Sequence, residues 1–278
     1  MSATVNSTAM SSTSANSAAP HGAPAPSAPS AGSLPVLVGH RGAAEVDPEN
    51  TLRSFRRGIA DGAQLLECDV HLSADGRDVI IHDATLDRTA QPESPLRTGA
   101  VADLTRAQLD TVLVGEGERI PTLTQVLEAS VAEDGTRIPL LVEIKAPAAA
   151  TLVIDILREH FPQEAWQDPH AAPACILSFH EEPLRVAAAD APQIPRMRTT
   201  TATTPEFWAS AQELGVQRVG VRIADARQAD VERARELGMH LNLWTARTEE
   251  ELERALELGC DSITVDDPAW AHALMAGA

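Results

Sequence analysis

Residues 65–83 are LLECDVHLSADGRDVIIHD, and the path of this segment settles how the strands around it can be arranged. Two apolar runs, Leu65–Asp69 and Val79–Ile81, are joined by His71–Asp78, which contains the turn-forming sequence SADG. A crossover between parallel strands needs about a dozen residues, so this connection is too short for one. We therefore expect the second run to return antiparallel to the first, as a hairpin arm.

Other short apolar runs recur along the chain, and helical patterns lie between most of them. Between Val36–Gly39 and the hairpin, for example, Leu52, Phe55 and Ile59 fall on one helical stripe. Strands that alternate with helices are typical of parallel βα units. The further runs are Val36–Gly39, Leu140–Ile144, Cys175–Ser178, Ile194–Met197, Val219–Arg222, Leu241–Trp244 and Ser262–Val265.

With the hairpin arm set aside, eight parallel strands remain, and they predict an α/β fold of the (β/α)8 TIM-barrel type. The segment 84–120, rich in proline, glycine and charge, is then a small insertion at the barrel mouth. A doubly wound α/β sheet is the competing fold, but no GxGxxG follows the first strand. We expect one barrel domain over residues 34–278.

The composition excludes several classes of protein. With 22 basic and 40 acidic side chains in 278 residues, the formal net charge of −18 argues against a partner such as nucleic acid. No run of about 18 apolar residues occurs, so we expect no stable membrane association. Cys68, Cys175 and Cys260 are widely spaced and lack a CxxC motif, which predicts small buried hydrophobic residues in a reducing compartment.

Residues 1–33 form a segment of distinct composition, dominated by alanine, serine, threonine and proline. No charged side chain precedes Arg41, and the segment lacks the basic and apolar regions of a signal peptide. Such a composition cannot bury enough apolar surface to offset the entropy of ordering. We therefore expect a disordered tail and a cytoplasmic protein.

Acidic side chains gather at the ends of the predicted strands, where the chemistry of TIM barrels takes place. Glu67 and Asp69 alternate along one strand and so point to the same side, into the barrel mouth. Glu143 and Lys145, the only lysine of the chain, share a face of a neighbouring strand. Three such carboxylates predict a site for one divalent cation, Mg²⁺ or Ca²⁺. An ion pair with an arginine from another strand is the alternative.

Two histidines also lie at the ends of predicted strands. His40 ends the first strand and precedes Arg41, whose planar guanidinium suits phosphate oxygens. His82 ends the hairpin arm, which returns it to the level of Asp69. One imidazole can then take a proton from an attacking hydroxyl while the other gives one to a leaving oxygen. Trp244 ends a later strand, where it either walls the substrate pocket or packs in the core.

Two neighbouring motifs have a structural interpretation. His71 lies on the inward side of its strand but beyond the mouth, so we expect a structural histidine. Glu49-Asn50-Thr51 opens the first helix, and we expect these residues to serve the helix start.

These motifs occur in a characteristic order: His40-Arg41-Gly42, Glu49-Asn50-Thr51, Glu67-Cys68-Asp69-Val70, Asp75-Gly76, His82-Asp83, Pro121-Thr122-Leu123, Glu143-Ile144-Lys145, Ser178-Phe179 and Trp244-Thr245. In this order they resemble the glycerophosphodiester phosphodiesterase family, from about Val36 to Pro268. Two departures concern substrate preference: His180 follows Ser178-Phe179 where an acidic or amide residue is expected, and Val265 precedes Asp266 where threonine is usual.

The resemblance implies a metal-dependent hydrolase that cleaves glycerophosphodiesters to glycerol 3-phosphate and an alcohol. It implies an attack by the glycerol 2-hydroxyl on phosphorus, giving a cyclic phosphate that water then opens. It assigns the divalent cation to Glu67, Asp69 and Glu143, acid–base catalysis to His40 and His82, and the phosphate to Arg41 and Lys145. Two alternatives remain, a lysophospholipase D-like activity on longer lipids and a phosphodiester-binding protein without activity.

Overall fold

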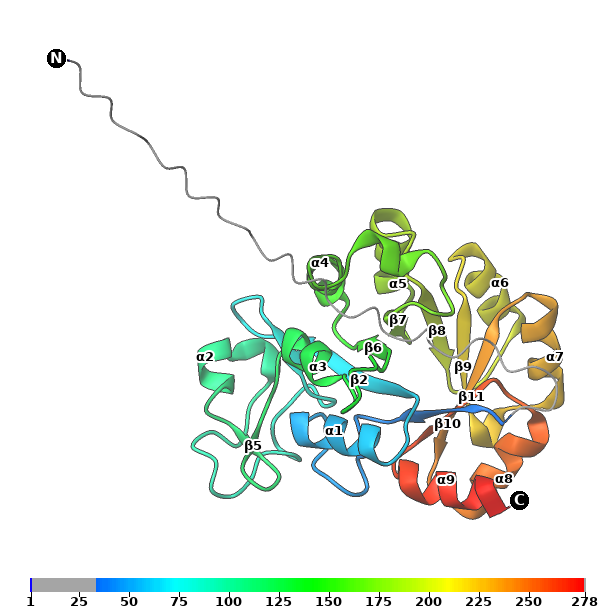
Figure 1. The fold of residues 1–278 in the computed structure, drawn as a ribbon, viewed down its shortest axis with the longest axis horizontal. Coiled ribbons are helices and arrows are strands. Elements are labelled where there is room, and N and C mark those ends of the chain that lie inside the picture. The colour runs from blue at the N-terminus through cyan, green and yellow to red at the C-terminus, as the bar shows by residue number, and fades with distance from the viewer. Residues whose placement is uncertain (2–33, 278) are drawn as a thin grey trace.

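The computed structural model of the chain describes Met1 and residues 34–277, so residues 2–33 of the predicted disordered tail lie outside the described residues (Figure 1). The strands are β1 (Val36–Gly39), β2 (Leu65–Leu72), β3 (Asp78–Ile80), β4 (Leu113–Val114), β5 (Glu118–Arg119), β6 (Leu140–Ile144), β7 (Ala174–Ser178), β8 (Arg196–Thr200), β9 (Arg218–Arg222), β10 (His240–Ala246) and β11 (Ser262–Val265). The helices are α1 (Leu52–Ala60), α2 (Arg106–Leu109), α3 (Leu123–Ala129), α4 (Ala150–His160), α5 (Glu181–Asp190), α6 (Pro205–Glu213), α7 (Gln228–Glu236), α8 (Glu249–Leu258) and α9 (Pro268–Gly277).

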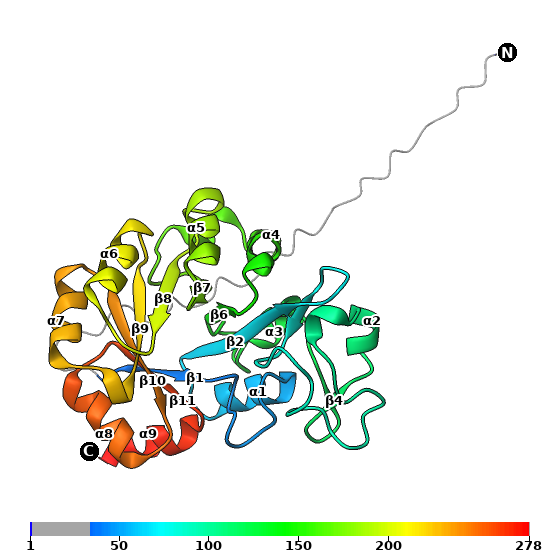
Figure 2. The same cartoon turned by 180° about the vertical axis from the view of Figure 1, so that it is seen from behind.

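A closed parallel barrel forms the centre of the molecule, with helices around it (Figure 1 and Figure 2). In the part of the chain that the structure describes, its strands follow the order β1-β11-β10-β9-β8-β7-β6-β2, and β1 pairs with β2 to close the ring. The predicted TIM barrel is therefore confirmed. The closing pair is short: Val38 lies opposite Leu65 and Gly39 opposite Leu66, whereas β1 and β11 share four residue pairs.

The hairpin arm has the predicted antiparallel direction. In β2 and β3, Val70 pairs with Ile80, and Leu72 with Asp78. The turn between them is held by Ser73, whose backbone N–H donates to the Arg77 carbonyl at 2.9 Å and whose hydroxyl accepts from the Arg77 N–H at 2.9 Å. This serine thus fixes the return that carries His82 back towards the barrel.

The inside and outside of the barrel follow from the alternation of side chains along each strand. On β2, Leu66, Cys68 and Val70 are fully buried among the surrounding helices, in the larger apolar core. A second apolar cluster is drawn from strand residues of the opposite parity and includes Val38, Leu65 and Leu141. Glu67 and Asp69 share the parity of Leu65, which places them further along the same inner face of the strand.

Threonine side chains begin the helices that flank the first strands. The Thr51 hydroxyl accepts a hydrogen bond from the Ser54 N–H and so caps α1. At α3, Thr122 and Gln125 form a reciprocal capping box. These caps define where each helix starts and hence the length of the loop that precedes it.

Residues 84–120 form the predicted small insertion, which lies beside the C-terminal part of β2 and contains α2, β4 and β5 (Figure 2). The segment packs around its own apolar cluster, in which Leu86, Val101 and Leu109 are buried against Val79 and Ile81 of the hairpin arm. The insertion is therefore attached to the hairpin rather than to the outer helices.

The three cysteines can be compared with the prediction from composition. Cys68, Cys175 and Cys260 are buried and form no disulfide in the described residues, as expected for small hydrophobic side chains. Across residues 34–277, no helix combines the length and the apolarity that a membrane crossing requires.

Candidate active site

The three predicted carboxylates come together at the C-terminal ends of two neighbouring strands. The parallel register of β2 and β6 places Asp69 directly opposite Glu143, and Glu67 lies two residues earlier on β2. Glu67 and Asp69 are 5% and 1% exposed, and the Glu143 side chain is 12% exposed. One oxygen from each carboxylate lies within 4.8 Å of the others.

The electrostatics of this acidic cluster fit a bound cation. Burial and the repulsion of Asp69 and Glu143 raise the pKa of Glu67 well above its usual range. Burial and Asp69 also raise the pKa of Glu143, to about 7, although Lys145 opposes the shift. Glu67 Oε1 is buried and has no hydrogen-bond partner among the described residues. Such closely spaced oxygens are ligands that Mg²⁺ and Ca²⁺ prefer.

Asp69 differs from its two neighbours because basic groups surround it. Arg41 Nε lies 3.2 Å from Asp69 Oδ2, and Lys145 Nζ lies 3.6 Å from Oδ1. Burial alone would raise the pKa of Asp69, but Arg41 and Lys145 together lower it below its usual range. The alternative that an arginine pairs with these carboxylates therefore holds for Asp69, while Glu67 keeps its orphaned oxygen.

Arg41 occupies a tight turn directly after β1. Its φ of 51° lies in the left-handed region, and its backbone N–H donates to Glu67 Oε2 at 3.0 Å. Nη1 donates to Glu49 Oε1 at 3.0 Å. The guanidinium is thus held between the carboxylates of Glu49 and Asp69.

The Glu49-Asn50-Thr51 motif has more than the expected helix-start role. Only Thr51 acts as the cap, whereas Glu49 pairs with Arg41. Asn50, with a φ of 58°, donates from Nδ2 to Asp69 Oδ2 at 2.8 Å. The sequence analysis therefore missed two residues that orient the site, and their side-chain contacts to residues up to 39 positions away explain why.

His40 is held by a residue that the sequence analysis did not identify. Asp266 Oδ1 lies 2.5 Å from His40 Nδ1, and its other oxygen accepts from Arg247 Nε at 2.5 Å. Burial lowers the pKa of His40 although Asp266 opposes this shift. His40 Nε2 lies 3.9 Å from Glu67 Oε2, so it faces the acidic cluster. The signal for Asp266 was its place directly after strand β11.

His82 follows β3 and is oriented by its neighbour in sequence. Nδ1 lies 2.6 Å from Asp83 Oδ1. The His82 carbonyl accepts a hydrogen bond from His71 Nε2 at 3.0 Å. This bond is consistent with the structural interpretation of His71, since it ties the hairpin arm to β2 near His82.

The predicted site residues border one cavity of about 300 Å³. Phe179 and Trp244 form part of its wall, with ring centroids 5.4 Å apart in an edge-to-face contact, and Lys145 Nζ lies 5.9 Å from the Phe179 centroid. Asp69 is buried beside this cavity, where Arg41 and Lys145 contact it. The predicted residues that line the cavity directly are His40, Arg41, Glu67, His82, Glu143, Lys145 and Trp244.

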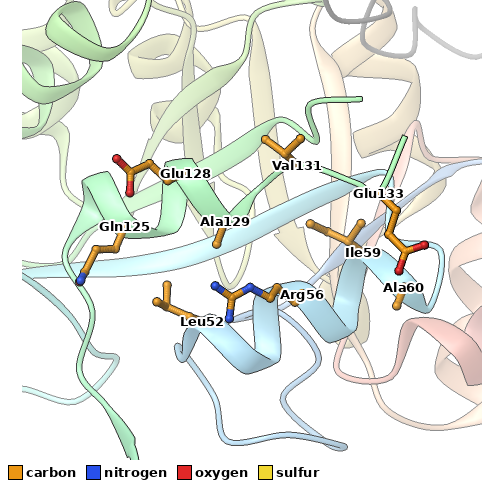
Figure 3. A pocket seen from close by; sticks show the side chains of 9 residues that line it. All are labelled: Leu52, Arg56, Ile59, Ala60, Gln125, Glu128, Ala129, Val131 and Glu133. Atoms are coloured by element: carbon orange, nitrogen blue, oxygen red, sulfur yellow. The ribbon is translucent and has the colours of Figure 1, made fainter. Parts of the chain in front are cut away.

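A larger hollow of about 710 Å³ lies on the outside of the barrel, between α1 and α3 (Figure 3). Leu52 and Ile59 contribute apolar surface from α1, and Arg56 adds a basic group beside them. None of the predicted site residues lines it, so it is separate from the carboxylate and histidine cluster.

Comparison with known proteins decides the family. The model of the glycerophosphoryl diester phosphodiesterase family matches residues 40–270, which contain all of the predicted site residues. This chain belongs to that family. The phosphodiesterase is 30% identical over 245 residues to the glycerophosphodiester phosphodiesterase of Caldanaerobacter subterraneus subsp. tengcongensis, covering 84% of this chain and 94% of the relative.

Solved structures agree with the family assignment. The phosphodiesterase superimposes on an Oleispira antarctica phosphodiesterase in complex with the product sn-glycerol-3-phosphate, with a TM-score of 0.76 and 25% identity, over 87% of this chain and 97% of that chain. It also superimposes on the glycerophosphodiester phosphodiesterase of Agrobacterium tumefaciens, with a TM-score of 0.70 and 25% identity, over 86% of this chain and all of that chain.

Proposed function

We propose that this phosphodiesterase hydrolyses small glycerophosphodiesters to glycerol 3-phosphate and an alcohol in the cavity that His40 and His82 border. The observation that carries the proposal is the convergence of these imidazoles, two carboxylates and two basic side chains on one cavity of about 300 Å³, with Asp69 buried beside it. This volume is at the lower end of the range for small-molecule sites. The relative from Oleispira antarctica, described with sn-glycerol-3-phosphate, supports the same product here.

Glu67, Asp69 and Glu143 would hold one divalent cation, Mg²⁺ or Ca²⁺. The orphaned Glu67 oxygen and the raised pKa values of Glu67 and Glu143 support this assignment, because a cation would relieve both. When bound, the cation supplies positive charge that offsets the negative charge of the phosphate oxygens.

His40 is suited to act as the base. If Nδ1 carries a proton and donates it to Asp266, Nε2 has a lone pair to accept the proton of the attacking hydroxyl. Asp266 would then stabilise the imidazolium that forms, while Arg247 holds the other oxygen of Asp266 in place. We place the 2-hydroxyl of the substrate's glycerol as the attacking group, which leads to a cyclic phosphate.

His82 is suited to act as the acid. Asp83 accepts from Nδ1 and stabilises the imidazolium, whose Nε2–H is donated to the oxygen of the leaving alcohol as its bond to phosphorus breaks. In the second step the roles reverse: His82 takes a proton from water, the water oxygen attacks phosphorus, and His40 gives its proton to the glycerol O2 as the bond from this oxygen to phosphorus breaks. The products are glycerol 3-phosphate and the alcohol.

Arg41 and Lys145 would bind the phosphate oxygens, and Trp244 would contact the substrate beside them. Each basic group already neutralises a carboxylate, which keeps it in place and ionised. Trp244 Nε1 is buried and lacks a hydrogen-bond partner among the described residues. A substrate oxygen would satisfy this donor.

The test is hydrolysis of glycerophosphocholine, glycerophosphoethanolamine and glycerophosphoglycerol with added Mg²⁺ or Ca²⁺. We expect activity that chelator abolishes, and a fall in rate of roughly 10²–10⁴-fold for His40→Ala and for His82→Ala. His160→Ala, on the outer helix α4, is the control and keeps the wild-type rate. Full activity of both active-site variants would overturn the assigned roles.

Two other outcomes of the same panel separate the alternatives. Faster hydrolysis of lysolipids than of glycerophosphodiesters would indicate the lysophospholipase D-like activity. Calorimetric binding of glycerophosphocholine without turnover, with the cation supplied, would indicate a binding protein. The cytoplasmic location stays a prediction from the sequence.

A further inference from the structure

Arg88, in the insertion, donates hydrogen bonds to two carboxylates at the edge of the active site. Towards Asp83, Nε donates to Oδ2 at 2.6 Å and Nη2 to Oδ1 at 3.1 Å. Towards Glu49, Nη1 donates to Oε2 at 2.7 Å and Nη2 to Oε1 at 2.7 Å. Two-pronged contacts of this kind fix direction as well as distance, which a single ammonium group cannot do.

The two carboxylates that Arg88 grips serve different catalytic groups. Asp83 Oδ1 is also the atom that lies 2.6 Å from His82 Nδ1. Glu49 Oε1 is also the atom to which Arg41 Nη1 donates at 3.0 Å. One guanidinium therefore orients both the carboxylate behind the histidine and the carboxylate behind the phosphate-binding arginine.

The charges of this cluster depend on Arg88. Its hydrogen bonds are the largest cause of the lowered pKa of Asp83, and His82 lowers this pKa further. For Glu49, burial raises the pKa, and Arg88 and Arg41 together outweigh burial and lower it. Without Arg88, two neighbouring carboxylates would lose the cation that they share, and each would be freer to turn away from its catalytic partner.

The position of Arg88 is set by the apolar cluster of the insertion. Leu86 is fully buried in that cluster, and its N–H donates to the Gly99 carbonyl at 3.1 Å. The Ala90 N–H donates back to the Leu86 carbonyl at 2.9 Å, which closes the turn that carries Arg88. The backbone that carries Arg88 is thus held by the packed insertion, although the Arg88 side chain itself is 49% exposed.

We propose that Arg88 is a positioning residue that orients His82, through Asp83, and Arg41, through Glu49, and thereby makes the insertion part of the catalytic machinery. This inference rests on the acid–base role of His82 proposed above. It assigns to residues 84–120 a function in the reaction, in addition to covering the hairpin arm.

The test compares Arg88→Met and Arg88→Lys with a matched control, Arg53→Met. Arg53 is similarly exposed, at 46%, and also joins two carboxylates across the junction of barrel and insertion, Asp47 and Glu116. Among the described residues, no hydrogen bond or ion pair joins Asp47 or Glu116 to His82 or Arg41. We expect Arg88→Met to lower kcat roughly 10–100-fold with a smaller change in KM, Arg88→Lys to recover part of this loss, and Arg53→Met to keep the wild-type kcat.

A second measurement reads the orientation of His82 without relying on activity. In enzyme labelled with ¹⁵N-histidine, above the pH at which imidazoles are protonated, we expect the His82 nitrogens to report the Nδ1–H form in the wild type. Arg88→Met should give a mixture of both neutral forms, while Arg53→Met stays as the wild type. His82→Gln identifies the signals.

Three results would overturn the proposal: a wild-type kcat in Arg88→Met while His82→Ala is inactive, a loss of kcat that matches only the unfolded fraction seen by circular dichroism, or unchanged His82 nitrogen shifts. If the wild type hydrolyses no glycerophosphodiester, the proposed function fails instead. The nitrogen shifts then still decide whether Arg88 orients His82.

Discussion

Glu143 lies between two charged neighbours whose effects oppose each other. Lys145 Nζ is 3.0 Å from its Oε1, while Asp69 stands opposite on the adjacent strand. Burial and Asp69 prevail and raise the pKa of Glu143 to about 7. This carboxyl group therefore holds a proton for part of the time at neutral pH, and a cation must compete with that proton.

From this competition we predict that Mg²⁺ and Ca²⁺ bind more tightly as the pH rises from about 6 to about 8, with release of protons. Calorimetric titration in two buffers of different ionisation enthalpy measures both quantities. Glu143→Gln should release fewer protons, whereas Glu128→Gln on the outer helix α3 should behave as the wild type. Equal affinity at both pH values without proton release would contradict the prediction.

The residues that the sequence analysis found are those whose chemistry coincides with a strand end. Glu67, Asp69 and Glu143 were placed by the two-residue alternation of strands, and the structure brings their oxygens together. Asn50 and Asp266 were missed because their contacts depend on how distant loops meet. Asp266 is 226 positions from His40, and no local pattern links them.

At the scale of elements, the loop between β1 and α1 depends on a glycine that a side chain would block. Gly42 has a φ of 93°, and a Cβ there would lie 2.5 Å from Ser54 Oγ and 2.6 Å from the Phe55 backbone N. The Gly42 segment also carries Arg41, so any shift of this loop moves the guanidinium away from Asp69.

We predict that Gly42→Ala lowers the free energy of unfolding more than Gly76→Ala, and that it also lowers kcat. Gly76, in the hairpin turn, has a φ of 70° but open space around a Cβ, so its substitution costs only the left-handed penalty of about 1–2 kcal/mol. Urea unfolding and kcat of both variants provide the measurement. A smaller loss for Gly42→Ala would show that the loop can relax.

The elements themselves were largely predictable because each strand is a short apolar run between helical stripes. The hairpin direction followed from the length of its turn, and the antiparallel pairing of β2 with β3 confirms it. The apolar cluster of the insertion was not predicted. Leu86, Val101 and Leu109 are far apart in an irregular segment, and they meet through turns that have no period.

For the whole molecule, a pair of stacked histidines links stability to pH. His170 and His240 lie with ring centroids 4.1 Å apart, beside Arg218 and within the influence of Asp168 and Asp261. Burial, Arg218 and His170 lower the pKa of His240 from its ordinary 6.5 to about 4. Between these values the unfolded chain binds the proton and the folded chain does not.

The buried neutral His240 therefore makes its full contribution to the free energy of unfolding above about pH 6.5, and this contribution is lost as the pH falls towards 4. We predict that the urea midpoint falls less between about pH 7.5 and pH 5 in His240→Gln than in the wild type. His272→Gln, on α9, is the control and should follow the wild type. Identical curves for all three proteins would contradict the prediction.

The short pairing of β1 with β2 has a consequence for how the enzyme holds its shape. Only two residue pairs join these strands in the described ladder, yet the Arg41 N–H reaches Glu67 across the same junction, and Asn50 reaches Asp69. The active-site contacts thus reinforce the barrel at this short strand pair. A substrate bound between Arg41 and the acidic residues would add contacts across the β1–β2 pair. Substrate binding should therefore also stabilise the closure of the barrel.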